Sequence, residues 1–275
     1  MSLSFCSFSS GSSGNCYLVK TDSAALLIDA GISATRILKE LGRTDTPPES
    51  VKALFLTHEH FDHVTGARVL MKKLGNANVY ASRGTMEATI SRDKYKPYSF
   101  EEDVSEDRRI IIVPDETVEI GDMTVRAFRT MHDSCEPFGY RISSGGKHIA
   151  ILTDTGIVSE DMIDYTADAD VLVLEANHDT ELLRHGSYPQ YLKQRILSDQ
   201  GHLSNSQAAD TLLRIFHSDG KKRVVLLAHL SGENNDPSIA EKTVLTALAR
   251  NGLYTGSDLY MGVLLRDTAS LLYRL

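Results

Sequence analysis

Short apolar runs alternate with amphipathic stretches along the first half of the chain. The runs are rich in β-branched and other apolar residues and are bounded by Gly, Ser, Asn, Asp or Pro, a pattern typical of β-strands. They occupy residues 16–19, 24–29, 53–57 and 78–81. The amphipathic stretches repeat apolar residues every three or four positions, which predicts one helix over 33–42 and another over 62–75.

The second half continues this mixture of strands and helices. Five short strands are predicted within 110–152, and two continuous apolar runs, 171–176 and 223–229, indicate strands covered on both faces. Helices are expected near 188–198, over 204–217 and from 238 to about 250, and the last two apolar runs resemble a closing hairpin. Ser204, followed three positions later by Gln207, has the spacing of a capping box.

No Pro- or Gly/Ser-rich linker and no short repeat interrupts this pattern, so we expect a single domain over residues 1–275. Strands and helices in this order are compatible with an α/β fold in which two sheets pack together and helices cover the outside.

Composition narrows the choice of partners. The 275 residues carry 29 basic and 37 acidic side chains, a formal net charge of -8. This balance argues against binding nucleic acid or an anionic membrane through bulk positive charge. Since no apolar run approaches the roughly 18 to 20 residues that span a bilayer, and the first residues lack the features of a signal peptide, we expect a cytoplasmic protein without membrane contact.

Histidine is the more informative count, because the three cysteines are widely spaced and form no CxxC motif. Of ten histidines, His58, His60 and His63 fall together with Asp62 in six positions, where an apolar strand ends and a helix begins. Imidazole and carboxylate ligands suit zinc and also manganese or iron. The sequence therefore predicts a metal site in this segment.

This HxHxDH element, residues 58–63, resembles the signature of the metallo-β-lactamase superfamily, and four further residues match the other motifs of that superfamily in order. They are Asp29 at the end of LLID, His132 in TMHDSCEPFGY, Asp154 in ILTDTG and His229 in VVLLAHLS. The resemblance covers nearly the whole chain and implies an αββα sandwich, with two mixed β-sheets flanked by helices.

The resemblance also implies a site for two divalent ions, zinc or manganese, with iron as a further option. It implies one ion on His58, His60 and His132, a second on Asp62, His63 and His229, and Asp154 bridging them. Asp29 would orient a ligand imidazole. Two such ions can share a hydroxide and neutralise the charge on an attacked atom, which makes Asp62 and Asp154 catalytic as well as metal-binding.

Two later motifs favour phosphodiester substrates. Glu175 in VLEANHD and His202 in GHLSNSQAAD resemble the paired Glu and His elements of the tRNA 3′-processing branch, although Leu174 stands where that branch has a histidine. A carboxylate that orients the imidazole would let His202 act as general acid for the leaving oxygen. The alternative is that the two residues form a structural pair near a helix N-terminus.

A narrower resemblance is to the WalJ/YycJ-type exonuclease branch. It rests on the segments SSGSSGN, HEHFDH, EANHD, YPQYLKQRILSDQGHLSN and AHLSGENNDP. It implies a 5′-to-3′ exonuclease on double-stranded DNA, with duplex ends as the partner and a metal-bridged hydroxide attacking phosphorus. The first segment offers Ser12, Ser13 and Asn15 to a phosphate, although a loop of this composition also serves as a flexible entry to a hairpin.

Other functions remain open. One is a small-molecule hydrolase of the same fold acting on a lactone, a thioester or a cyclic phosphodiester. Another is a redox or regulatory protein with a di-iron site, although the acidic ligand replacements and flavin-binding domain of such relatives are not visible. The helix that bears Tyr191, Lys193 and Arg195 either follows a DNA backbone or is a solvated face. No protein partner is indicated.

Overall fold

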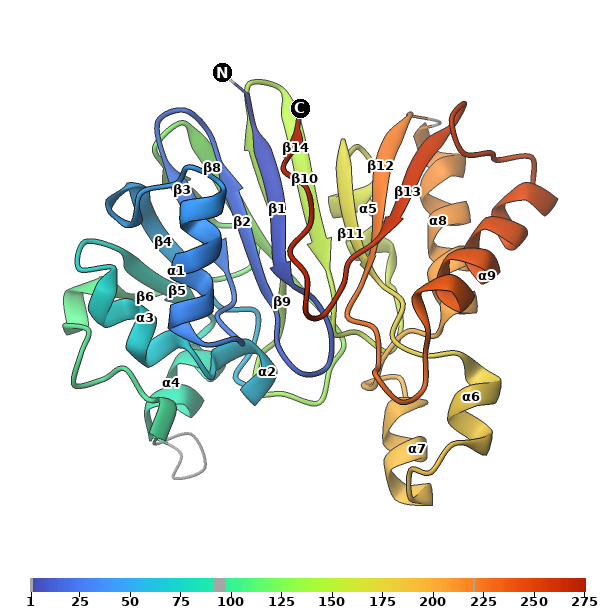
Figure 1. Cartoon of the computed structure of the whole chain (residues 1–275), viewed down its shortest axis with the longest axis horizontal. Coiled ribbons are helices and arrows are strands. Elements are labelled where there is room, and N and C mark those ends of the chain that lie inside the picture. Colours follow the sequence, from blue (N-terminus) through green and yellow to red (C-terminus); the bar gives the residue numbers. More distant parts are fainter. Residues whose placement is uncertain (1, 92–96, 220) are drawn as a thin grey trace.

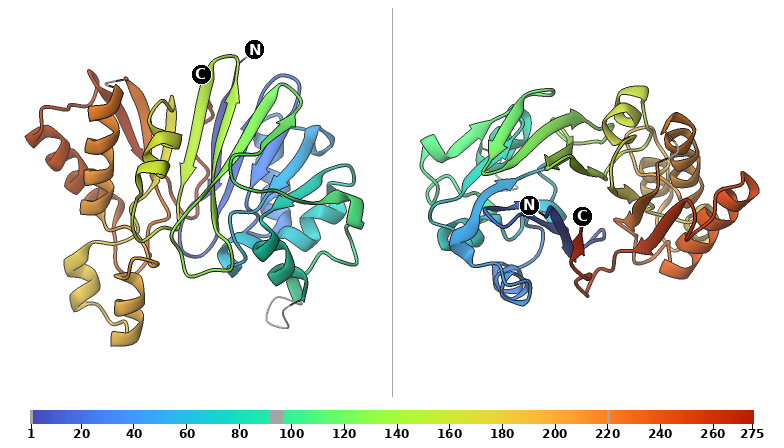
Figure 2. Two further views of the ribbon diagram at one scale, coloured as in Figure 1. Left: turned by 180° about the vertical axis from the view of Figure 1, so that it is seen from behind. Right: turned by 90° about the horizontal axis from the view of Figure 1, so that it is seen from above.

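The computed structural model describes residues 2–91, 97–219 and 221–275, which form two β-sheets packed face to face between two layers of helices (Figures 1 and 2). The first sheet has the order β14-β1-β2-β3-β4-β5-β6. Its strands are β1 (Ser4–Ser9), β2 (Cys16–Lys20), β3 (Ala25–Ile28), β4 (Val51–Phe55), β5 (Asn78–Ala81), β6 (Arg109–Ile111) and β14 (Tyr273–Arg274).

The second sheet has the order β13-β12-β11-β10-β9-β8-β7. Its strands are β7 (Thr117–Ile120), β8 (Met123–Arg129), β9 (Phe138–Ser144), β10 (Lys147–Leu152), β11 (Val171–Glu175), β12 (Arg223–Ala228) and β13 (Leu259–Val263). The strands from β7 to β10 pair antiparallel, whereas those from β10 to β13 pair parallel. The continuous apolar runs in β11 and β12 lie in this parallel half, which is covered on both faces.

Helices cover the outer face of each sheet. The first sheet is covered by α1 (Ala34–Arg43), α2 (Phe61–Val64), α3 (Ala67–Lys73) and α4 (Arg83–Ser91). The second is covered by α5 (Glu160–Thr166), α8 (Asn205–Asp219) and α9 (Pro237–Arg250). Two short helices, α6 (Thr180–His185) and α7 (Gln190–Ile196), project beyond the layers.

The alternation of side chains along the strands builds these layers. In β2, Tyr17 and Val19 enter the apolar core between the sheets, while Leu18 enters the core beneath the first helical layer. Successive strand residues face opposite sides of a sheet. A strand that is apolar at every position therefore needs both faces of its sheet to be covered. The αββα sandwich expected from the sequence is thereby confirmed. None of the helices in the described part of the chain is long and apolar enough to cross a bilayer.

The helix predicted over 62–75 is interrupted, and that prediction is wrong in detail. The segment forms α2 and α3, which are separated at Thr65 and Gly66. The Gly66 N–H donates to the Ala30 carbonyl at 2.7 Å, and a Cβ on Gly66 would lie 2.0 Å from the Ile32 carbonyl oxygen. The chain after β3 therefore packs against the helix axis, and this close approach breaks the helix.

The prediction of a closing hairpin at the C-terminus is also wrong. β13 pairs parallel with β12 in the second sheet, whereas β14 pairs antiparallel with β1 in the first. The C-terminal segment thus crosses from one sheet to the other instead of folding back on itself. The capping box at the start of α8 is confirmed, because the Ser204 N–H donates to Gln207 Oε1 at 2.9 Å and the Gln207 N–H donates to Ser204 Oγ at 3.3 Å.

Candidate metal centre

The histidines and carboxylates of the five sequence motifs meet where the strands end. Asp29 directly follows β3, and His229 directly follows β12. Asp29, Asp154 and His229 have φ angles of 61°, 57° and 55°, a left-handed conformation that side chains other than glycine rarely adopt. Such backbone strain is retained where the surrounding structure enforces it, typically at functional sites.

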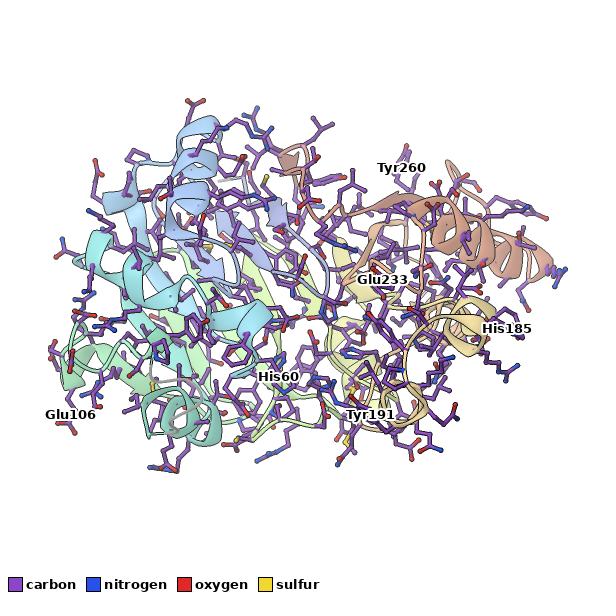
Figure 3. The ribbon with its side chains drawn as sticks, turned by 60° about the horizontal axis from the view of Figure 1, so that its bottom comes forward. His60, Glu106, His185, Tyr191, Glu233 and Tyr260 are labelled. Atoms are coloured by element: carbon purple, nitrogen blue, oxygen red, sulfur yellow. The ribbon has the colours of Figure 1, made fainter. Side chains whose placement is uncertain are left out.

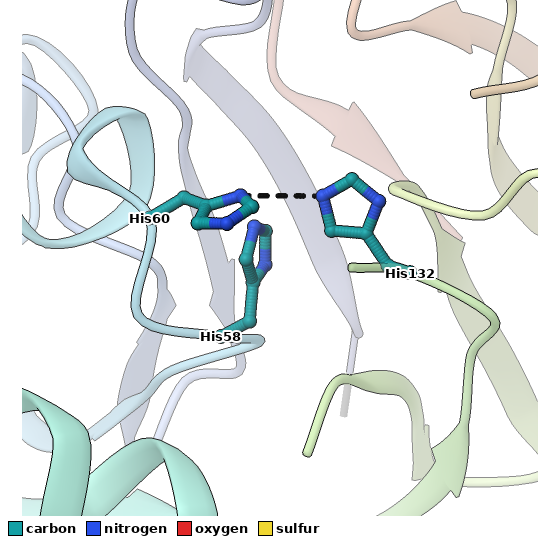
Figure 4. A group of neighbouring side chains, drawn as sticks. All are labelled: His58, His60 and His132. Carbon is teal, nitrogen blue, oxygen red and sulfur yellow. Dashed lines mark hydrogen bonds between the residues drawn. The ribbon is translucent and has the colours of Figure 1, made fainter. Parts of the chain in front are cut away.

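Three imidazoles form the first cluster, in which His58 and His60 come from the turn between β4 and α2, and His132 comes from the segment after β8 (Figure 4). One nitrogen from each of His58, His60 and His132 lies within 4.8 Å of the others, and His60 Nδ1 and His132 Nε2 are 3.2 Å apart. Burial, reinforced by the neighbouring imidazoles, holds the pKa of His58 well below its ordinary value, and burial lowers the pKa of His132 to about 4. The rings are therefore neutral, as metal-binding histidines must be.

The second cluster adjoins the first and is rich in carboxylates. Asp62 Oδ2 lies 3.3 Å from His63 Nε2 and 3.2 Å from His229 Nε2, and Asp154 Oδ2 lies 3.5 Å from His63 Nε2. Burial opposes a charge on either imidazole, but the carboxylates of Asp154 and Asp62 prevail and raise the pKa of His229 to about 10. Without a metal, protons on these imidazoles balance the buried negative charge.

Asp29 fixes the orientation of His63. It is fully buried, and its Oδ2 lies 2.7 Å from His63 Nδ1 while its Oδ1 accepts the Thr57 N–H at 2.8 Å. The Nδ1–H of His63 therefore faces Asp29, and Nε2 is turned toward Asp62 and Asp154. This arrangement is the one by which a carboxylate orients a metal-binding imidazole.

Glu175 holds two imidazoles, of which the sequence indicated one. Its Oε1 lies 2.7 Å from His202 Nδ1 and 3.0 Å from His229 Nδ1. Its Oε2 accepts the backbone N–H groups of Thr155 and Leu203 at 3.0 Å and 3.2 Å. Although burial opposes ionisation, the contacts with His202 and His229 lower the pKa of Glu175, so this fully buried side chain is a carboxylate.

The donor set fits divalent cations. His58 Nε2 and Asp154 Oδ2 are buried atoms with no hydrogen-bond partner in the described part of the chain, a costly state that a cation would relieve. The 3.2 Å between His60 Nδ1 and His132 Nε2 is close to the roughly 3.3 Å that separates two nitrogens on one tetrahedral zinc ion. Neutral imidazoles on one side and carboxylates on the other provide two adjoining sets of ligands.

A cleft of about 690 Å³ opens over these clusters, and it is lined by Ser12, Ser13, Gly31, His60, Phe61, Asp62, Thr65, Asp133 and Arg195. Ser12 and Ser13 are exposed in it, as the phosphate-binding hypothesis requires.

Asn15 lies beside the expected metal ligands, but it does not line the cleft. It is fully buried, and its Nδ2 contacts the Gly11 carbonyl oxygen at 3.1 Å and His63 Nε2 at 3.2 Å. Asn15 therefore braces the serine loop against the metal motif.

Sequence reasoning missed several residues that position the site. Thr57 Oγ1 lies between His58 Nδ1 and His63 Nδ1, at 3.0 Å and 3.1 Å. Glu59 is buried and accepts the Cys135 N–H at 3.0 Å, which anchors the loop that carries His132. A role for a glutamate between two histidines of the HxHxDH element could have been suspected, but its partner lies 76 residues away in sequence.

Comparison with known proteins agrees with this geometry. A family model described as a beta-lactamase superfamily domain matches residues 25–230. The structure of the metallo-β-lactamase fold protein YhfI from Bacillus subtilis aligns with this chain at a TM-score of 0.70 and 19% sequence identity. The alignment covers 100% of each of the two chains. The fold and the site together therefore define a member of the metallo-β-lactamase superfamily, a fold that implies binding of divalent metal.

Two curated relatives narrow the family. Exodeoxyribonuclease WalJ of Streptococcus pneumoniae serotype 2 (strain D39 / NCTC 7466) is 39% identical over 261 residues, which are 95% of this chain and 94% of the relative. Exodeoxyribonuclease YycJ of Bacillus anthracis is 35% identical over 259 residues, 93% of each chain. The chain belongs to the family of these two proteins.

Proposed function

We propose that this chain is a metal-dependent exodeoxyribonuclease that shortens double-stranded DNA from its 5′ ends. One observation carries the proposal beyond the likeness to WalJ and YycJ, namely that buried Glu175 holds His202 at the edge of the metal clusters. Hydrolysis of a DNA phosphodiester expels a deoxyribose oxygen that takes up a proton as it leaves, and an oriented imidazole beside the metals is suited to this task.

The proposed ligand sets follow the two clusters. His58, His60 and His132 would hold one divalent ion, Asp62, His63 and His229 a second, and Asp154 would contact both. Zinc and manganese suit these nitrogen and oxygen donors, and iron does too. The chemistry that bound cations supply is activation of a water nucleophile and neutralisation of charge on the attacked phosphate.

The side chains of the protein supply the remaining steps. Ser12 and Ser13 would donate hydrogen bonds to the phosphate in the cleft, from a loop held in place by Asn15. Glu175 accepts from Nδ1 of His202, so the opposite nitrogen, Nε2, would deliver the proton to the departing oxygen. Asp29 and Glu175 keep the ligands His63 and His229 in the orientation that metal binding requires.

A duplex labelled on one strand tests the activity and its direction. With added Mn²⁺ or Zn²⁺, a 3′-labelled strand should give a ladder of shortening products, whereas a 5′-labelled strand should release its label as the first product. Chelator and Asp62→Ala should abolish both patterns, and Asp45→Ala, at an exposed turn, should not.

The same assay separates the alternatives. DNA that stays intact with every metal, while the protein hydrolyses a lactone, a thioester or a cyclic phosphodiester, would replace the nuclease by a small-molecule hydrolase. If the 3′ label is released as the first product instead, the protein is still an exonuclease but digests DNA from its 3′ ends.

A further inference from the structure

The helices α6 and α7 form an arm, residues 180–196, that projects from the sandwich at the end where α2 carries the metal motif (Figures 1 and 2). With this end turned forward, Tyr191 of the arm and His60 both lie in the lower part of the molecule, away from Tyr260 (Figure 3). The arm is therefore placed beside the opening of the cleft.

Most cations of the arm serve the arm itself. Lys193 Nζ donates to the carbonyl oxygens of Arg184 and Gly186, both at 2.8 Å, and so ties α7 to the end of α6. Arg184 pairs with Glu181 one turn earlier on the same helix. The side chains of Lys193 and Arg184 therefore stabilise the arm, which makes Lys193 neither a DNA contact nor part of a merely solvated face.

Arg195 is different, because its side chain reaches out of the arm into the wall of the metal cleft. Asp133, the residue after the expected ligand His132, accepts from Nε of Arg195 and from Nη2 at 2.8 Å. This carboxylate holds one edge of the guanidinium, and the remaining nitrogen, Nη1, has no acceptor among the described residues. The side chain is 43% exposed, so a fixed, charged donor edge is accessible at the cleft. Such planar forks match phosphate oxygens.

An exposed aromatic ring accompanies this arginine. Tyr191 lies four residues before Arg195 on α7, and residues four apart share one face of a helix. It is 73% exposed, which is a large exposed fraction for an aromatic residue. Exposed aromatic rings are a common platform on which the bases of a single strand of nucleic acid stack.

We propose that this face of α7 binds the substrate strand next to the scissile phosphate, with Arg195 contacting a neighbouring phosphate and Tyr191 stacking on a base. The inference rests on the proposed nuclease function and adds the surface that distinguishes a polynucleotide from a small phosphodiester. It also explains how a protein with a net charge of -8 binds DNA, because a few local contacts at the cleft replace attraction by a broad positive surface.

Fluorescence anisotropy tests the proposal on the metal-loaded full chain, with a fluorescein-labelled duplex whose 5′ ends carry phosphorothioates that resist hydrolysis. We expect Arg195→Ala and Tyr191→Ala each to weaken binding about tenfold, the loss of one charged phosphate contact or one stacked base. A plot of log Kd against log salt should become shallower by about 0.9 for Arg195→Ala and stay unchanged for Tyr191→Ala.

Two matched controls should bind like the unaltered protein. Arg214→Ala removes an arginine that is 38% exposed and paired with Glu160, and Tyr260→Ala removes a tyrosine that is 56% exposed, both outside the cleft lining. Asp133→Asn separates phosphate binding from mere support of the His132 loop, because it breaks the ion pair but keeps the arginine. It should bind DNA no more weakly than the unaltered protein.

The proposal is overturned if Arg195→Ala or Tyr191→Ala binds the duplex normally, or if Asp133→Asn weakens binding as much as Arg195→Ala. These results would leave the nuclease function standing, provided that the unaltered protein still shortens an ordinary duplex. If the unaltered protein neither binds nor shortens DNA yet hydrolyses bis(p-nitrophenyl) phosphate, the proposed function fails and the surface fails with it.

Discussion

Glu175 makes one contact that the sequence predicted and one that it did not. The sequence paired it with His202 through their resemblance to known motifs, and the two side chains meet at 2.7 Å. The contact with His229 at 3.0 Å was not foreseen, because it joins the ends of two strands that are 54 residues apart. The clustering of imidazoles and a carboxylate within residues 58–63 could be predicted since these residues are neighbours in sequence, whereas the orienting contacts depend on how strand ends converge.

His202→Ala tests the proton donor through the leaving group. The rate of DNA hydrolysis should fall about 10² to 10⁴-fold, the range of general acid catalysis. Hydrolysis of bis(p-nitrophenyl) phosphate should fall far less, since p-nitrophenolate leaves without a proton. His217→Ala, at an exposed position on α8, is the control. Equal losses on both substrates would mean that His202 supports the metal centre instead of donating a proton.

Asp29→Asn should weaken metal binding. The amide cannot carry the charge that holds Nδ1–H of His63, and loss of such a partner typically reduces metal affinity about 10- to 100-fold. Zinc affinity measured by competition with a chelating dye gives the value. Asp45→Asn removes another aspartate with a left-handed backbone, but one exposed at a turn, and should have no effect. Unchanged zinc affinity in Asp29→Asn would exclude the orienting role.

At the scale of elements, apolar and alternating runs predicted strands such as β7, β11 and β12 but missed β1. β1, with the sequence SFCSFS, escaped because serine occupies half of its positions, although all six residues are buried. The break between α2 and α3 was equally invisible, since the apolar spacing continues through it. It depends on Gly66 lying against Ala30 and Ile32, a contact between segments more than 30 residues apart.

Gly66→Ala and Gly42→Ala should change stability in opposite directions. A Cβ at Gly66 would lie 2.0 Å from the Ile32 carbonyl oxygen, so the backbone must shift, and the free energy of unfolding should fall by about 1 to 3 kcal/mol. Gly42 lies inside α1 with nothing within 4 Å of its Cβ, and alanine there should add about 0.5 to 1 kcal/mol. Urea unfolding measures both, and a neutral Gly66→Ala would contradict the packing argument.

At the scale of the whole molecule, the αββα layers were predictable because five motifs in order resemble one superfamily, while the path of the C-terminus was not. The C-terminal run SLLYRL, which contains β14, is as apolar as the second strand of a hairpin would be. It pairs instead with the edge strand β1 of the other sheet, and the sequence carries no local signal of this pairing. The expectation of a single domain over residues 1–275 stays a prediction.

The buried charge of the site makes the stability of the metal-free protein depend on pH. In that state Asp154, Asp62 and Glu175 favour the protonated form of His229, and its pKa is raised to about 10 from an ordinary value near 6.5. A pKa raised by folding stabilises the protein fully below the unfolded value, and the stabilisation is lost as pH rises toward the folded value. We therefore expect the chelated protein to lose stability between pH 6.5 and 10, by about 1.4 kcal/mol per pH unit for one such group.

Metal-loaded protein is the internal control for this prediction. A bound cation replaces the proton as the balancing charge and binds better as histidines deprotonate, so the loaded protein should lose less stability over the same range. The difference in free energy of unfolding between loaded and chelated protein, measured in urea, should thus grow with pH. If the two curves stay parallel from pH 6.5 to 10, the carboxylates around His229 are not balanced by its proton.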